Sequence, residues 1–124
     1  MQRVMLKVSG EQLGSDEYNF DMDYALRVAS VITAMTSAGH AVACVMGGGN
    51  IVRGNKLHAN GFTNQVIADQ MGMLATVQNG LFLAETLKQQ GVENCRLYSN
   101  IPVESVCERF SYQRAESHLA SGGV

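Results

Sequence analysis

The stretch Cys44–Gly54, CVMGGGNIVRG, joins the end of an apolar run to three consecutive glycines and then to Arg53. The apolar run Ala41–Met46 lies between turn residues and predicts a buried strand. Glycines directly after a strand let backbone N–H groups approach an anion, and ligands of open α/β sheets bind at the carboxyl ends of strands. We therefore expect a phosphate at this turn, with Arg53 as a bidentate cation.

The first strand candidate ends in the same way. Residues Val4–Val8 form a short apolar run that leads into Ser9 and Gly10, with Lys7 inside the run. A lysine is almost never fully buried without a partner, so a charged ligand is expected near Lys7. Two glycine turns, each with a cation, predict a site for more than one phosphate. Tight turns without a ligand are the alternative, because neither the GxxxxGK[ST] nor the GxGxxG fingerprint is present.

The remaining segments alternate between helix and strand patterns. Asp21 is a plausible N-cap for a helix that ends at Gly39. The later elements are expected as a long helix over 65–90, a third strand over 95–99 and a short helix over 112–120. Inside the long helix, Gly72 and Gly80 predict close contacts. This alternation predicts one α/β domain with a mainly parallel sheet over residues 1–124.

Composition excludes several classes of protein. The chain has 124 residues, of which 46% are hydrophobic and 16% charged, and its net charge of -2 with mixed signs argues against a nucleic-acid partner. No window approaches the ~20 apolar residues of a membrane span, and MQRVMLKVSG is not typical of a signal peptide. Cys44, Cys95 and Cys107 are too widely spaced for a disulfide framework or zinc site, which fits a reducing cytoplasm.

Four motifs carry a resemblance to a known family: VMLKVSGE (4–11), VMGGGNIVRG (45–54), ADQMGMLATVQNGL (68–81) and SNIPVESVCERF (99–110). Together they resemble the N-terminal half of bacterial uridylate (UMP) kinases, which have the amino acid kinase fold. MGMLATVQNGL is the most specific part, since acetylglutamate and aspartate kinases share a lysine turn and a glycine turn but not that helix. The resemblance implies a three-layer α/β/α fold with a mainly parallel sheet, of which this chain is about half.

The resemblance also implies an activity, the transfer of the γ-phosphoryl group of Mg-ATP to UMP in pyrimidine nucleotide biosynthesis. Lys7 would be catalytic by neutralising charge on the transferred group, and Asp69 would accept hydrogen bonds from the UMP ribose. The implied ATP or phosphate contacts are Lys7, Ser9, Gly10, Gly49 and Arg53. The implied UMP contacts are Gly47, Gly48 and Asp69. Mg²⁺ would accompany ATP, and the protein would be a cytoplasmic homo-oligomer, a hexamer in the resembled family.

The sequence also departs from the family pattern. Asp69 is followed by Gln70 where histidine is common, and Gln65 stands near the place of a common arginine. Family members continue into a second half with a Gly-Thr-Gly turn, a threonine-rich loop, an aspartate that helps orient magnesium and the adenine pocket. A parallel sheet without that half exposes a strand edge and apolar faces, so we expect this half alone to fold marginally or to associate.

Two alternatives to a kinase therefore stay open. One is a regulatory half-protein that binds a nucleotide without catalysis. The other is a non-catalytic assembly or storage relative that keeps the fold and the contact surface of the long helix. No magnesium ligand is expected within this chain, because the usual ligating region lies in the second half.

Overall fold

Two parallel strands form the centre of the computed structural model, which describes all residues Met1–Val124. Strand β1 (Arg3–Val8) pairs with β2 (Ala41–Met46), with Arg3 opposite Ala41 and Val8 opposite Met46. Parallel strands need a long crossover connection. The 3-10 helix η1 (Glu11–Leu13) and helix α1 (Met22–Ser37) supply it. Both strands therefore end at the same edge of the sheet, where the two glycine turns follow.

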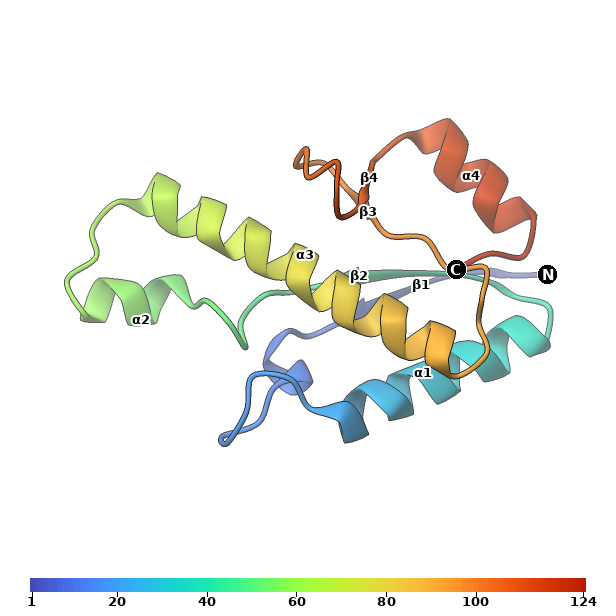
Figure 1. Ribbon diagram of the computed structural model, residues 1–124, viewed down its shortest axis with the longest axis horizontal. Helices are drawn as coiled ribbons and strands as arrows, with labels where there is room; N and C mark the ends of the chain where they lie inside the picture. Colours follow the sequence, from blue (N-terminus) through green and yellow to red (C-terminus); the bar gives the residue numbers. More distant parts are fainter.

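Helices cover the two faces of this sheet unequally (Figure 1). Helix α1 and the long helix α3 (Gln65–Gln89) pack against each other and against β2. Helix α4 (Tyr112–Ala120) lies on the opposite face, where Glu116 forms an ion pair with Arg3. The buried core between the sheet and helices α1 and α3 contains Val8, Leu13, Ala29, Ile32, Val42, Leu83 and Leu87. The arrangement is a three-layer α/β/α structure.

Local sequence signals explain where the helices begin and end. Asp21 is the N-cap of α1, and its side chain accepts hydrogen bonds from the N–H groups of Asp23 and Tyr24. Asn64 caps α3 in the same way. Gly39 follows α1 with φ +84°, a conformation that favours glycine. The three predicted helices are confirmed, with Asp21 as the predicted cap. The short helix α2 (Gly54–Ala59) was not predicted.

The predicted strand over 95–99 is wrong in extent and in partner. Only Tyr98–Ser99 forms a strand, β3, which pairs in parallel with β4 (Glu108–Arg109) and not with the central sheet. The earlier part of the segment pairs with the last residue instead. Val124 N–H donates to the Asn94 carbonyl at 2.9 Å, and Arg96 N–H donates to the Val124 carbonyl at 3.0 Å. An apolar pattern alone does not identify the partner of a strand.

The two glycines inside α3 behave differently. A Cβ at Gly80 would lie 2.5 Å from Leu97 Cδ1, so Gly80 lets the Leu97 side chain approach the helix closely. The predicted close contact is confirmed there, although its partner is a loop residue. A Cβ at Gly72 would meet no atom within 4 Å. The missing side chain of Gly72 is therefore not what permits a close contact within this chain, although its carbonyl oxygen lies against Gly48.

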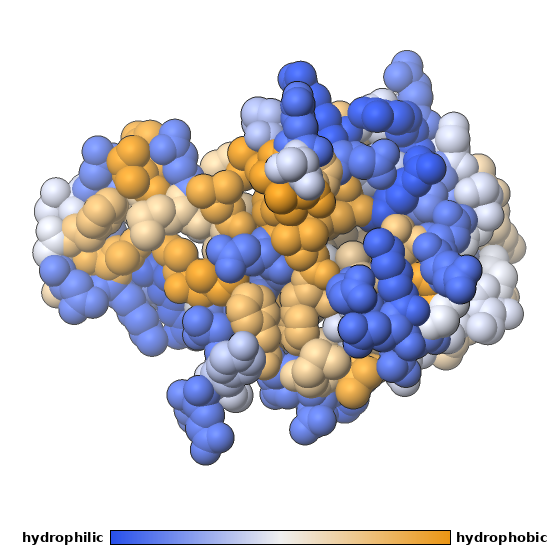
Figure 2. Space-filling view, in the orientation of Figure 1, coloured by the Kyte–Doolittle hydropathy of each residue, from blue (hydrophilic) through white to orange (hydrophobic).

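Apolar side chains remain exposed beside this core. A cavity of about 440 Å³ lies between β2, α3, α4 and the segment before β3, and 18 of its 24 lining residues are hydrophobic. Apolar residues also gather over the N-terminal part of α3 (Figure 2). The exposed apolar residues of α3 are Val66, Ile67, Met71, Met73, Leu74 and Leu81. These surfaces agree with the expectation that the chain exposes apolar faces.

None of the helices combines the length and the apolar content that a bilayer crossing requires.

Burial raises the pKa of the Cys44 thiol to about 11, and the nearby Cys95 thiol adds to the shift. The pKa of Cys95 is raised as well, again mainly by burial. All three cysteines are free. Cys44 and Cys95 pack against the core, where they act as small apolar side chains.

The buried Cys44 thiol predicts a pH dependence of stability. Its pKa is higher in the folded than in the unfolded chain, so its contribution is full below about pH 9 and is lost as the pH rises towards 11. We expect the free energy of unfolding to fall by roughly 2–3 kcal/mol over this range. Denaturant unfolding of the natural chain and of Cys44→Ala, measured across the range, checks this. An identical slope in both proteins would contradict it.

Candidate functional site

The two glycine turns touch each other through their backbones. A Cβ at Gly10 would lie 2.6 Å from the Gly47 carbonyl carbon and 2.6 Å from the Gly49 nitrogen. The Gly47 N–H donates to the Val8 carbonyl at 3.1 Å, which continues the pairing of β1 and β2 beyond their ends. Glycine is required here because no side chain fits between the turns.

The second turn also lies against α3. A Cβ at Gly48 would lie 2.9 Å from Ala75 Cβ and 2.9 Å from the Gly72 carbonyl oxygen. The three glycines therefore contact two different neighbours. Gly47 and Gly49 face the first turn, and Gly48 faces the long helix. Close backbone packing within the chain explains the triple glycine without any ligand.

Several backbone donors of these turns have no partner in the protein. The N–H groups of Ser9, Gly10, Gly48, Gly49 and Asn50 donate to no protein atom. Backbone N–H groups are strong donors that normally find an acceptor. A cluster of free N–H groups from successive residues is a geometry that binds anions. The predicted phosphate site therefore coincides with unused donors on both turns.

Lys7 lies beside this cluster, but it is not buried as predicted. Its side chain is exposed and forms no ion pair or hydrogen bond within the chain. The expectation failed because only one face of β1 is covered by α1 and α3, whereas Lys7 lies on the other face, opposite Val45 in register. Burial therefore does not demand a partner for Lys7. Its free ammonium group is available to a ligand.

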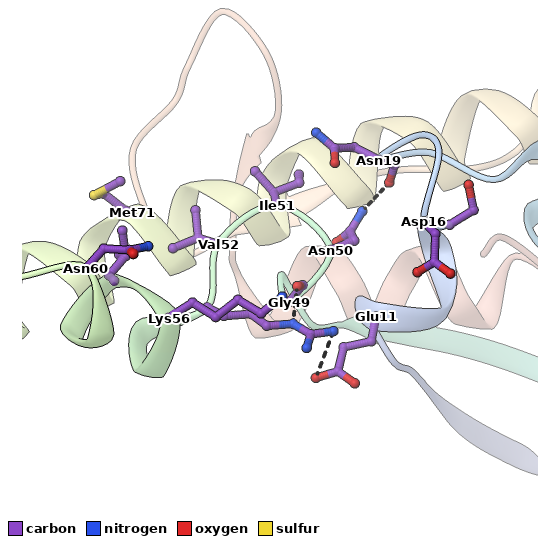
Figure 3. Close-up of a pocket in the computed structure, with 14 residues that line it drawn as sticks. Glu11, Asp16, Asn19, Gly49, Asn50, Ile51, Val52, Lys56, Asn60 and Met71 are labelled. Carbon is purple, nitrogen blue, oxygen red and sulfur yellow. Dashed lines mark hydrogen bonds and ion pairs between the residues drawn. The ribbon is translucent and has the colours of Figure 1, made fainter.

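Arg53, the N-cap residue of α2, already has partners within the chain: Gly49 and Glu11, which are labelled in Figure 3. Its Nε donates to the Gly49 carbonyl at 2.9 Å, and its Nη2 lies 3.5 Å from Glu11 Oε1. These contacts hold the guanidinium group against the second glycine turn and η1. A phosphate at Arg53 would have to compete with the Glu11 carboxylate. Sequence reasoning did not identify Glu11 as part of the site.

A buried pair of amides holds the second glycine turn in place. Asn79 of α3 is 0% exposed, and its Nδ2 donates to the Gly47 carbonyl at 2.7 Å and to Asn50 Oδ1 at 2.6 Å. Asn50 Nδ2 donates in return to Asn79 Oδ1 at 3.0 Å and to the Asn19 carbonyl at 2.8 Å. Sequence reasoning missed both amides. The signal was an asparagine in the middle of an apolar helix, where asparagine is a poor helix former.

An open cavity of about 480 Å³ adjoins the second turn, and 10 of its 14 lining residues are not hydrophobic. The predicted residues that line it are Gly49 and Arg53, and Lys56 adds a further cation (Figure 3). The predicted residues that do not line it are Lys7, Ser9, Gly10, Gly47, Gly48 and Asp69. The structure thus brings the glycine turns and Arg53 together. Asp69 is on α3 outside the lining of this cavity, and its exposed carboxylate accepts a hydrogen bond from Gln65.

Fold and site together define an α/β protein with two contacting glycine turns, and unused backbone donors on both, at the carboxyl ends of two parallel strands. The model of the amino acid kinase family matches residues 2–124. The uridylate kinase of Sulfurovum sp. (strain NBC37-1) is 44% identical over 123 residues, which are 98% of this chain and 52% of that protein. The uridylate kinase of Colwellia psychrerythraea (strain 34H / ATCC BAA-681) is 45% identical over 123 residues, or 98% of this chain and 49% of that protein.

Solved structures agree with these relatives. The UMP kinase from Bacillus anthracis superposes with a TM-score of 0.91 at 33% identity, covering 98% of this chain and 50% of that one. The UMP kinase from Ureaplasma parvum superposes with a TM-score of 0.90 at 30% identity, covering 100% and 54%. The chain belongs to the amino acid kinase family, and the predicted fold and resemblance are confirmed. It spans about half the length of the curated relatives it matches.

The packing of Gly48 predicts a sharp difference between two glycine substitutions. Gly48→Ala would place its Cβ 2.9 Å from a backbone oxygen of α3, so we expect a destabilisation of about 1–3 kcal/mol. The matched change is Gly72→Ala on α3, where the new methyl group would meet no atom within 4 Å. We expect Gly72→Ala to be neutral or to stabilise the helix by up to about 1 kcal/mol. Chemical denaturation of both variants measures this. Equal destabilisation by the two would contradict the packing.

The Glu11–Arg53 contact predicts that removal of the carboxylate strengthens anion binding. Glu11→Gln frees the guanidinium group, and because the pair is largely exposed we expect the affinity for inorganic phosphate to rise by up to about fivefold at low salt. Glu93→Gln, an exposed site that makes no ion pair, controls for net charge. Calorimetric titration with phosphate compares the variants. An equal gain in both would show a general charge effect.

Proposed function

We propose that this chain forms the acceptor side of a UMP kinase, which transfers the γ-phosphoryl group of ATP to UMP and yields UDP and ADP. The carrying observation is the pair of touching glycine turns with unused N–H donors, flanked by Lys7 and Arg53. The names of the relatives supply the substrate. The assignment of UMP contacts to Gly47, Gly48 and Asp69 is part of the proposal.

The chemistry asked of such a site is positioning and charge neutralisation. In the transfer, an oxygen of the UMP phosphate bonds to the γ-phosphorus as the bond to the β,γ-bridging oxygen breaks, and ADP leaves with that oxygen. Little covalent work falls to the protein. Donors and cations that are already fixed in place stabilise the charge on the moving phosphoryl group without reorganisation.

The chain's residues take distinct roles in this proposal. Lys7 neutralises charge on the transferred group, because its ammonium has no competing partner. Ser9 and Gly10 line the path of the transferred phosphoryl group. Arg53 and Gly49 hold phosphate, while Gly47 and Gly48 pack against UMP. Asp69 accepts hydrogen bonds from the ribose hydroxyls.

Magnesium is part of the proposal only as the companion of ATP. No group of three His, Cys, Asp or Glu side chains lies close enough in this chain to hold a metal ion. We assign no magnesium ligand to this chain. Homo-oligomer formation, action in the cytoplasm and a role in pyrimidine nucleotide biosynthesis are further parts of the proposal.

The chain by itself lacks the ATP-binding half of the proposed kinase, so we do not expect turnover from it alone. The test is UMP binding by this chain, and UMP-dependent ADP formation by a full-length version that also carries the second half. We expect Arg53→Ala to weaken UMP binding about tenfold or more, because it removes a charge-assisted contact. Lys7→Ala should leave UMP affinity nearly unchanged and lower turnover by about a hundredfold or more. Lys88→Ala, an exposed lysine at the far end of α3, is the control.

Calorimetry measures the binding, and a coupled assay with Mg-ATP measures the turnover. Absence of UMP binding, or equal rates with glutamate or aspartate as acceptor, would exclude the proposal. UMP binding without ADP formation by the full-length version would favour the second candidate, a non-catalytic nucleotide-binding protein of this fold.

A further inference from the structure

A chain of hydrogen bonds joins α2 to α3 beside the site. His58 of α2 places its Nε2 2.6 Å from Gln65 Oε1, and Gln65 Nε2 donates to Asp69 Oδ1 at 2.7 Å. Both distances are short, and the second bond is assisted by the charge of the carboxylate. The other oxygen of Asp69, Oδ2, has no partner in the chain. The carboxylate is therefore held by one oxygen and free at the other.

The donor and the acceptor of both hydrogen bonds, His58–Gln65 and Gln65–Asp69, can be assigned. An ionised carboxylate only accepts, so the amide nitrogen of Gln65 must face Asp69. The amide oxygen of Gln65 then faces His58, and an oxygen only accepts as well. His58 Nε2 must therefore carry a proton and donate it. Reversal of the amide would place its oxygen against the Asp69 carboxylate, so a single arrangement satisfies all three side chains.

The same amide lies against the beginning of α2. Gln65 Nε2 is 4.0 Å from the position of a Cβ on Gly54, the first residue of α2, and His58 lies four residues later on the same face. Arg53 is the N-cap of this helix. The bonded chain thus ties the helix that follows Arg53 to the helix that carries Asp69.

We propose that His58 and Gln65 are positioning residues that set the spacing between Asp69 and Arg53 for a ribonucleoside monophosphate. Asp69 Oδ2 then receives a ribose hydroxyl while Arg53 receives the phosphate of the same molecule. The inference rests on the proposed function, which supplies an acceptor with both groups. Neither residue touches the nucleotide in this assignment, and both act through Asp69 and α2.

The test compares UMP with 2′-deoxyuridine monophosphate, which lacks one ribose hydroxyl. We expect Gln65→Met to weaken UMP binding about fivefold and to change binding of the deoxy compound less than twofold, because only the ribose contact depends on an oriented Asp69. Gln89→Met, another exposed glutamine of α3, should change neither. Equal weakening of both nucleotides by Gln65→Met would show a merely structural role and overturn the proposal.

Rescue at His58 gives a second readout. His58→Gln retains a donor for Gln65 Oε1 and should keep the preference for UMP, whereas His58→Phe retains the ring without the donor and should lose it. The double variant His58→Phe with Gln65→Met should bind UMP no more weakly than the weaker single variant, because one chain of contacts is broken in each. Additive losses, or failure of His58→Gln to retain the preference, would contradict the proposal.

Failure of this inference is distinguishable from failure of the proposed function. If the natural chain binds no UMP, the proposed function fails, and nitrogen-15 NMR of the His58 ring decides the bonded chain by itself. A proton on His58 Nε2, with ring chemical shifts that change in Gln65→Met, would support the hydrogen bond from His58 to Gln65. Unchanged shifts overturn it. If the natural chain binds UMP and prefers it over the deoxy compound, yet Gln65→Met preserves that preference, only the positioning inference fails.

Discussion

The contact between the backbones of Gly10 and of Gly47 and Gly49 is the constraint on which the other features depend. Parallel pairing brings the carboxyl ends of β1 and β2 together, and the turns that follow must then pass each other within van der Waals distance. Glycine alone permits this approach. The same closeness leaves N–H groups of both turns in one place without protein acceptors. The packing of the strands thus produces the anion-binding geometry.

The position of α3 follows from the same turn. Gly48 lets the turn pack closely against the Gly72 carbonyl and Ala75. Asn79, one helical turn beyond Ala75, donates a hydrogen bond to the Gly47 carbonyl. Asn79 is fully buried, and both hydrogens of its amide as well as its oxygen are used. A buried polar network that is fully satisfied rigidifies its surroundings. The long helix therefore fixes the turn as much as the sheet does.

The sequence was informative wherever the signal is local. The cap at Asp21, the helical spacing of apolar residues and the two glycine turns are properties of short segments, and these were found. The short helix α2 and the cap at Asn64 were missed, and the other failures concern contacts between distant segments. The segment before Tyr98 pairs with Val124, which no local pattern indicates. Lys7 is exposed because α4, the helix on its face of the sheet, contacts β2 and Arg3 at the start of β1 and leaves Lys7 uncovered, a fact of topology and not of the strand's own composition.

The candidate site shows the same division. The glycine turns could be located from the sequence because three consecutive glycines after an apolar run are a local signal, whereas the phosphate expected there stays a prediction. Asn79 was missed, and Gln65 was noted only as a departure from the family pattern, because the role of each side chain depends on which residues lie across the interface.

The two cations of the site differ in a way that only the structure reveals. Lys7 is exposed and has no partner within the chain, whereas Arg53 is held by the Gly49 carbonyl and lies against the Glu11 carboxylate. A fixed guanidinium group suits a phosphate that stays in place, since its planar donors match two oxygens at once. A flexible ammonium group suits a phosphoryl group that moves, because it can follow the charge without a fixed set of partners. The unequal surroundings of the two residues therefore favour Arg53 for the resident phosphate of the acceptor and Lys7 for the group in transfer.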